Sequence, residues 1–214
     1  MLLLGHTGIT LGAVALVNGI LSKSHGLHKR ENKVTKRLQT LPEIKSAQEH
    51  HSGSRLSSLT SLTNRIDIRL LLIGSLLPDI FDKPIGQFFF RDSLSNGRIF
   101  CHTLAFLLLI TVAGSYLYRS YKKTWLLVLS LGTFTHLICD QMWLTPRTLL
   151  WPLYGWTFQR ADLTLWMQNI FYALRTNPAV YIPELVGAAV LIWFLVVLVR
   201  RRQVYAFIRN GRLF

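Results

Sequence analysis

Five long apolar stretches alternate with polar segments along this chain of 214 residues. A helix that crosses a bilayer needs about 20 mostly apolar residues, and each stretch is close to that length. The pattern predicts an all-α, polytopic membrane protein with five transmembrane helices, at residues 2–21, 68–90, 102–118, 124–144 and 181–199. Charges and two prolines interrupt the second stretch, which predicts that its helix restarts or turns after Pro78, where protein or water surrounds the backbone.

The same pattern divides the chain into five segments. Residues 1–21 form the first transmembrane helix, which lacks the basic start and cleavage site of a signal peptide and is expected to be retained. Residues 22–67 are expected to be a basic cytoplasmic loop, partly disordered. Residues 68–144 contain the core helices with the site motifs, residues 145–180 an outer aromatic loop and an interfacial helix, and residues 181–214 the last span and a basic cytoplasmic tail.

The distribution of charged residues predicts how the chain is oriented in the membrane. The chain has 24 Lys and Arg residues against 10 Asp and Glu, a net charge of +14. Most of the basic residues lie in residues 22–69, 119–123 and 200–214. Basic loops stay on the cytoplasmic side, which predicts a multi-pass protein of the cell (inner) membrane with its N-terminus outside and its C-terminus in the cytoplasm.

The composition also excludes several classes of protein. Half of the residues are hydrophobic and only 16% are charged, which argues against a soluble enzyme. Two cysteines cannot form a disulfide framework. The basic segment 22–67 has no aromatic residue on which a base could stack. Its charge therefore indicates attraction to anionic lipid, and nucleic acid is not favoured as a partner.

The outer segment is rich in aromatic residues that are typical of a membrane interface. Trp151, Tyr154, Trp156 and Phe158 predict an interfacial aromatic belt. Asp162 can cap an amphipathic helix that lies flat at the outer surface. This helix can either cover a polar site and admit lipid-like substrates from the side, or serve only as an anchor.

Six ionisable residues lie inside the predicted spans, where burial of a charge is costly and points to a function. With a rise of about 1.5 Å per residue, the predicted topology puts each of them in the outer half of the hydrocarbon core. They come from four different spans, which predicts one polar site in the outer half of the bundle. The six residues are His6, Asp79, Asp82, His102, His136 and Asp140.

These residue types suit a divalent metal ion. His136 and Asp140 are four residues apart and share a helix face. Imidazoles and carboxylates together favour Zn²⁺, while Mn²⁺ and Fe²⁺ also fit, so we predict all six residues as metal ligands. Each residue alone has a simpler explanation: Asp79 can cap a helix, and Asp82 can pair with Lys83. A proton relay would use the same groups as the metal site.

Three residues are candidates for a catalytic role. Asp82 can act as a general base instead of a ligand, with His102 beside it in the predicted site. Arg98 lies just before His102 and can hold an anionic group such as phosphate. Arg147 in the outer loop is a further candidate for the same task. Arg98 can also be a simple interfacial anchor.

Five sequence blocks carry a family resemblance. They are GHT at 5–7, GSLLPDIFDKP at 74–84, GR at 97–98 with HT at 102–103, HLICDQMW at 136–143, and LWPLYGW at 150–156. In this order and wording they resemble the predicted inner-membrane, metal-dependent hydrolases of prokaryotes, also described as LexA-regulated hydrolases. The resemblance covers most of the chain except residues 22–67 and the fifth span. It implies a hydrolase site that contains the six residues.

The chain departs from the family pattern at two places. Better-known members read P-D-I-D-H, whereas this chain reads P-D-I-F-D at residues 78–82. They also read H-R-x-x-T-H-S, whereas this chain has Gly97 for the first His and Cys101 for the Thr. One ligand can therefore be missing or displaced, which leaves the number of metal ions open. The family has been compared with zinc-dependent phospholipase C-like enzymes, a distant analogy that favours phosphoesters.

We therefore expect a membrane-bound, metal-dependent hydrolase that acts on an amphiphilic or lipid-like substrate, for instance a phosphoester, through a metal-activated water. The chain has no G-x-S-x-G motif for a serine nucleophile. Two other classes stay open: a proton- or ion-coupled transporter and a non-catalytic membrane scaffold. The expected partners are membrane lipid and the substrate, and the sequence gives no indication of the oligomeric state.

Overall fold

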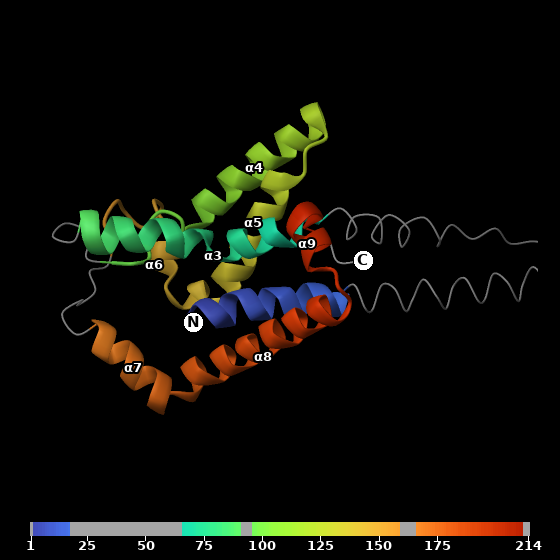
Figure 1. Ribbon diagram of the computed structural model, residues 1–214. Helices are drawn as coiled ribbons and strands as arrows, with labels where there is room; N and C mark the ends of the chain where they lie inside the picture. Colours follow the sequence, from blue (N-terminus) through green and yellow to red (C-terminus); the bar gives the residue numbers. More distant parts are fainter. Residues whose placement is uncertain (1, 18–65, 91–95, 159–165, 212–214) are drawn as a thin grey trace, which may run out of the picture. The chain divides into compact units, whose positions relative to one another are not determined.

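The structure is a computed structural model that describes residues 2–17, 66–90, 96–158 and 166–211 (Figure 1). All regular secondary structure in these ranges is helical, which confirms the predicted all-α class. The chain divides into two units, residues 1–12 with 67–214 and residues 13–66. Of the second unit, the structure describes only residues 13–17 and residue 66. Most of the predicted loop at 22–67, and the predicted cap at Asp162, therefore lie outside the described residues.

The described helices follow the apolar stretches of the sequence. The first helix is Leu3–Val17. The others are α3 (Ile68–Pro84), the π-helical turn η1 (Ile85–Phe89), α4 (Leu104–Tyr121), α5 (Trp125–Cys139), the 3-10 turn η2 (Met142–Leu144), α6 (Pro146–Leu149), α7 (Trp166–Thr176), α8 (Pro178–Arg200) and α9 (Val204–Asn210).

Two of the described helices, α4 and α8, are long and apolar enough to cross a membrane. Both expose large apolar side chains: Leu109 and Val112 on α4 are each 67% exposed, and Leu185 on α8 is 65% exposed. Runs of exposed apolar side chains are typical of surfaces that contact lipid. The first helix and α5 are also apolar, but they are shorter than α4 and α8. The number of five transmembrane helices therefore stays a prediction.

Helix α3 runs without a break through Pro78, where the sequence predicted a restart or turn. Proline has no N–H and leaves the carbonyl four residues earlier, that of Gly74, without its helical donor. The hydroxyl of Thr133 on α5 donates to this carbonyl at 3.3 Å. A contact from the neighbouring helix therefore replaces the hydrogen bond that proline removes. Asp79 lies inside α3, so it does not cap a helix.

Glycines bring α3 and α5 into backbone contact. A Cβ atom at Gly74 would lie 2.5 Å from the carbonyl oxygen of Leu129, and one at Gly132 would overlap the carbonyl oxygen of Leu71. Small residues allow this kind of close approach between membrane helices. The contact sets how closely the polar residues at the ends of α3 and α5 approach each other.

The first helix lies beside α8 (Figure 1). Gly8 and Gly187 face each other so closely that a Cβ atom at Gly8 would overlap the backbone of Gly187. Further along, Leu11 of the first helix, Ile68 of α3 and Phe194 of α8 belong to one buried apolar cluster. These contacts join the first helix, which carries His6, and α3, which carries Asp79 and Asp82, to a common apolar core with α8.

Glu184 on α8 anchors the start of the first helix. Its buried carboxylate accepts hydrogen bonds from the N–H groups of Leu2 at 2.6 Å and of Leu4 and Gly5 at 3.1 Å. N–H groups in the first turn have no partner within their own helix, and the helix dipole favours an acid at this end. Glu184 thereby fixes the turn that carries His6.

The start of α3 is tied to the C-terminal helix α9. Asp67 caps α3 and pairs with the Arg69 guanidinium at 2.6 Å. Arg69 also donates to the carbonyl of Ile208, and the N–H of Ile68 donates to the carbonyl of Gly211 at 2.8 Å. The hydrogen bond from the Arg69 side chain holds the pKa of the Asp67 carboxyl below its usual range.

Candidate metal centre

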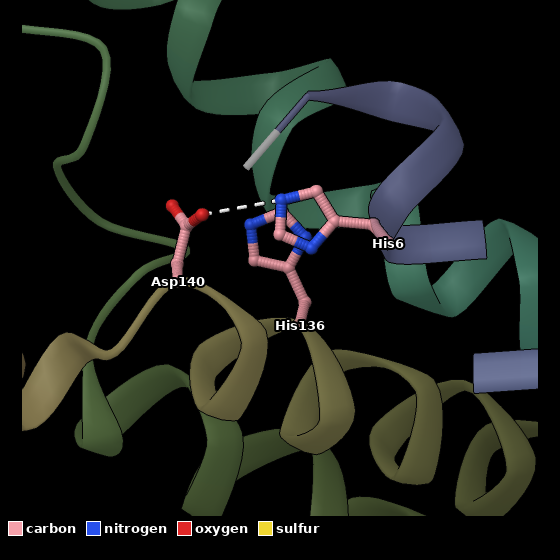
Figure 2. A group of neighbouring side chains, drawn as sticks. All are labelled: His6, His136 and Asp140. Carbon is pink, nitrogen blue, oxygen red and sulfur yellow. Dashed lines mark ion pairs between the residues drawn. The ribbon is translucent and has the colours of Figure 1, made fainter. Parts of the chain in front are cut away.

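The six ionisable residues singled out in the sequence lie together in the structure. All six side chains are buried, and the most exposed of them, that of Asp79, has 6% of its surface accessible. Figure 2 shows three of them in contact. His6 comes from the first helix, Asp79 and Asp82 from α3, His102 from the loop before α4, His136 from α5, and Asp140 from the end of α5.

Asp82 contacts the Nδ1 side of the His102 ring. Its carboxylate accepts a hydrogen bond from His102 Nδ1 at 2.7 Å. It also accepts from the backbone N–H groups of Ile99 at 2.9 Å, Cys101 at 3.0 Å and His102 at 3.1 Å. The Cys101 bond comes from the main chain, so the change from the family's Thr to Cys preserves it. With four donors around it, Asp82 is engaged by the loop that precedes α4.

His136 is oriented by the main chain of α3. Its Nδ1 lies 2.6 Å from the backbone carbonyl oxygen of Ser75. A carbonyl can only accept, so the hydrogen is on Nδ1. The same reasoning applies to His102, since the charged carboxylate of Asp82 can only accept from its Nδ1. Both neutral rings are thereby left with Nε2 as an acceptor.

The Nε2 atoms of His102 and His136 lie 3.2 Å apart. Two acceptor lone pairs at this distance repel each other unless a cation lies between them. That cation is either a proton, which makes one ring an imidazolium, or a metal ion. Asp79 Oδ1 is 3.6 Å from His102 Nε2 and 3.9 Å from His136 Nε2, and Asp140 Oδ2 is 3.9 Å from His102 Nε2. Bonds of about 2.0–2.2 Å to a tetrahedral zinc put ligand atoms roughly 3.3–3.6 Å apart. The separations here, from 3.2 to 3.9 Å, lie close to that range, so small movements of these side chains would let the donor set bind a metal ion.

Two overlapping groups of these side chains have the arrangement of a metal site. One consists of His6, His136 and Asp140, the other of Asp79, His102 and His136, and the ligand atoms of each group lie within 4.8 Å of one another. His136 belongs to both groups. Its Nδ1 is bound to Ser75, and the remaining Nε2 lone pair can bind one ion. The two groups therefore describe parts of a single site.

His6 covers one side of His136. The two rings stack with centroids 4.1 Å apart (Figure 2). His6 Nε2 lies 3.1 Å from Asp140 Oδ1, the ion pair drawn in the figure. Both of its ring nitrogens are fully buried, and neither has a hydrogen-bond partner among the described residues. A buried polar atom without a partner is rare and indicates a bound species or a chemical role.

Two cationic side chains contact the carboxylates from outside. Lys83 Nζ lies 2.6 Å from Asp79 Oδ2, and Arg98 Nη2 lies 2.8 Å from Asp140 Oδ2. The side chains of Lys83 and Arg98 are 32% and 42% exposed. The buried acids thus lie between the imidazoles on one side and an accessible cationic rim on the other. Arg147 is exposed on α6 and makes none of these contacts.

An aromatic cluster supports the loop that carries His102. Phe100 packs edge-on against Trp151 and Phe158, with ring centroids 5.5 and 5.2 Å away. Trp151 in turn stacks on Phe158 and contacts Trp156 edge-on. Three of the four aromatic residues predicted as an interfacial belt therefore meet next to the candidate site.

Sequence reasoning missed two residues that shape the site. Glu184 is an acid within a long apolar stretch, which is a recognisable signal, yet it was not singled out. Lys83 was considered only as a partner of Asp82, whereas the structure pairs it with Asp79, one helical turn away. The sequence could not indicate that the backbone carbonyl of Ser75 orients His136, because every residue has a backbone carbonyl.

The described helices and the buried His and Asp cluster define an all-helical membrane protein with a candidate metal site. A model of the YdjM inner membrane protein family matches residues 48–209. The chain belongs to this family, which supports the inner-membrane, LexA-regulated type of family that the motifs resemble. The match includes the last predicted span, which the motif resemblance does not cover, and it begins after the first helix. Searches among curated proteins and among solved structures gave no significant match.

Proposed function

We propose that the chain is a membrane-bound, metal-dependent hydrolase. The observation that carries the proposal is the pair of Nε2 atoms of His102 and His136, 3.2 Å apart and both left as acceptors. A divalent cation removes the repulsion between them. It also offsets the charge of Asp79 and Asp140, whose burial is otherwise costly.

In this proposal His102, His136, Asp79 and Asp140 hold the ion. Their nitrogen and oxygen donors favour Zn²⁺, and Mn²⁺ or Fe²⁺ also fit. Such an ion, when bound, lowers the pKa of a water molecule to about 7 and supplies a nucleophile. The protein's part is to hold the two imidazoles in one tautomer and to exclude bulk water from the four buried side chains.

Asp82 takes a different role from the one the sequence suggested. We expected it as a ligand or a general base, but four N–H groups already use its lone pairs. We assign it as a positioning residue that keeps the hydrogen of His102 on Nδ1. Partners of this kind orient metal-binding histidines and raise their basicity.

His6 is the group that we propose takes up a proton. Its Nε2 is 3.1 Å from Asp140 Oδ1, which favours the tautomer with the hydrogen on Nε2. Nδ1 then carries a free lone pair, consistent with its lack of a partner among the described residues. Histidine is the side chain that most often transfers protons in enzymes, and a free Nδ1 lone pair suits His6 to this task.

We propose an amphiphilic or lipid-like substrate, with phosphoesters as the first class to test. The exposed apolar faces of α4 and α8 support contact with acyl chains. The aromatic cluster of Phe100 and Trp151 beside the His102 loop supports a site near the membrane interface.

The topology with five spans and an outer N-terminus belongs to the same proposal. It puts residues 22–67 and 200–214 on the cytoplasmic side. The hydrogen bonds between the start of α3 and the end of α9, such as Ile68 to Gly211, support this arrangement because both lie at that predicted side. The candidate site then faces the outer leaflet.

One alternative function is based on the same pair of Nε2 atoms, those of His102 and His136. A proton shared between His102 and His136 would also relieve their repulsion, and the nearby carboxylates would stabilise the imidazolium. A proton-coupled transporter could be built on such a relay. It would contain no stoichiometric metal and would move a solute across liposome membranes in response to a pH gradient.

Metal analysis of the purified full chain tests the proposal. We expect about one divalent ion per chain in the wild type, and loss of that ion in His136→Ala and Asp79→Ala. His50→Ala removes a histidine that the proposal does not use as a ligand and serves as the matched control. Turnover of a panel of lipids and phosphoesters by the wild type, absent in His102→Ala, would support hydrolysis. A metal-free wild type whose stability is unchanged in both site variants would refute it.

A further inference from the structure

We infer that Lys83 and Arg98 form a binding subsite for a phosphate-type oxyanion, and that this subsite and the metal ion strengthen each other's binding. The inference rests on the proposed metal site and adds the chemistry of the group that the site accepts. It concerns the cationic rim, which the metal-site proposal itself does not use.

Each of the two acids divides its oxygens between the imidazole side and the cationic side. Asp79 directs Oδ1 toward the two Nε2 atoms and Oδ2 toward Lys83 at 2.6 Å. Asp140 directs Oδ1 toward His6 at 3.1 Å, and its Oδ2 lies 2.8 Å from Arg98 and 3.9 Å from His102 Nε2. Asp79 can therefore face an ion through Oδ1 while Oδ2 keeps Lys83, and Asp140 can offer an oxygen to the ion while it remains beside Arg98.

The charge of the site becomes more positive when a divalent ion binds. The mutually contacting side chains include three carboxylates, Asp79, Asp82 and Asp140, and two cations, Lys83 and Arg98. The imidazoles are neutral in the form that binds a metal. A divalent ion adds two positive charges to these groups. The loaded site thus attracts an anion more strongly than the metal-free site does.

The exposure of the side chains puts this charge where a ligand can reach it. The two cations are 32% and 42% exposed, whereas their partners Asp79 and Asp140 are 6% and 3% exposed. Arg98 offers a planar fork that matches phosphate oxygens, and Lys83 offers a compact point charge. A tetrahedral oxyanion has enough oxygens to contact both cations.

Thermodynamic linkage makes the coupling reciprocal: if the metal tightens anion binding, the anion tightens metal binding by the same factor. Coupling of this kind is typically about 5- to 150-fold. Loss of Lys83 or Arg98 should abolish the coupling. It should not weaken the metal site itself, because removal of a nearby positive charge favours a cation.

The test measures the Zn²⁺ affinity of the purified full chain by competition with a chromogenic chelator, with and without inorganic phosphate. We expect phosphate to tighten Zn²⁺ binding about tenfold in the wild type. In Lys83→Gln and Arg98→Gln we expect Zn²⁺ to bind at least as tightly as in wild type without phosphate, and phosphate to have no effect. Arg98→Lys retains the charge and should keep part of the coupling. Arg119→Gln removes an exposed arginine at the far end of α4 and is the matched control.

A second arm separates a free anion from a lipid headgroup. The same titration is made in nanodiscs of phosphatidylcholine, with or without phosphatidate. Tightening by phosphatidate supports a lipid phosphate as the ligand, and tightening by inorganic phosphate alone supports a free oxyanion. If the wild type binds Zn²⁺ and neither anion changes its affinity, the subsite is refuted while the metal site stands. If Zn²⁺ does not bind at all, both proposals fail.

Discussion

His136 on α5 and the backbone carbonyl of Ser75 on α3 are joined by a hydrogen bond of 2.6 Å. One turn earlier on α5, Thr133 donates to the preceding carbonyl of α3, that of Gly74, which Pro78 leaves without its helical partner. Consecutive main-chain groups of α3 thus hold two side chains of α5. The orientation of His136 follows from this contact and not from any side chain on α3.

The first prediction separates a ligand from a positioning residue. We expect Asp82→Asn to weaken Zn²⁺ binding by about 10- to 100-fold, the usual effect of removing the partner of a metal-bound histidine. The amide would present a donor to backbone N–H groups that now donate to a carboxylate. Asp79→Asn should weaken binding more, because it changes an atom that faces the ion. Equal losses in a chelator competition assay would make Asp82 a ligand, contrary to our assignment.

A second prediction concerns the contact between the first helix and α8. We expect Gly8→Ala to destabilise the protein by about 1–3 kcal/mol, the cost of overpacking, because the new methyl group overlaps the backbone of Gly187. Gly12→Ala is the matched control on the same helix, since its Cβ would lie an ordinary 3.6 Å from Val190. Thermal unfolding in detergent measures both. Equal unfolding temperatures would contradict the close approach of the two helices.

The third prediction addresses the anchor of the first helix. Glu184→Ala leaves three N–H groups at the start of that helix without their acceptor, at a cost of about 1–3 kcal/mol for a buried unpaired group. Glu184→Gln keeps one oxygen and should fall between Glu184→Ala and wild type. Chemical denaturation in detergent provides the ranking. A Glu184→Ala protein as stable as wild type would show that the carboxylate is not an anchor.

A fourth prediction follows from the lowered pKa of Asp67. A carboxyl whose pKa is lower in the folded state stabilises the protein above its unfolded pKa of about 3.9, and this contribution is lost as the pH falls through the folded pKa. We therefore expect Asp67→Asn to be less stable than wild type at neutral pH, and the difference to shrink in acid. Arg69→Met should reproduce the effect, since its hydrogen bond is the main cause of the shift.

The measurement is the unfolding temperature of wild type, Asp67→Asn and Arg69→Met, followed from neutral to acid pH. A difference between Asp67→Asn and wild type that stays constant from neutral to acid pH would contradict the ion pair as the source of the stability.

The sequence predicted the membership of the candidate site better than its internal geometry. The cost of ionisable groups in apolar stretches singled out His6, Asp79 and His136, and the span directions predicted that they share one level of the membrane. The structure brings them together. The hydrogen bonds of Asp82 could not be predicted, because they come from N–H groups of a loop that is 17 to 20 residues away in the chain.

The helices show the same difference between what the sequence predicted and what depended on contacts in the structure. The apolar stretches predicted where helices lie, yet Pro78 was interpreted as a break. Helix α3 continues through it because Thr133 on another helix supplies the missing donor. A residue pattern within one stretch carries no information about a donor on a neighbouring helix.

By itself, the sequence determined which stretches avoid water and which polar residues interrupt them, because hydropathy and helical rise are properties of each segment alone. Only the tertiary structure decided which atoms face each other. Glycines at helix contacts set how closely the segments approach, and acceptors on neighbouring elements choose the tautomer of each histidine. These two effects leave the Nε2 atoms of His102 and His136 facing each other, 3.2 Å apart.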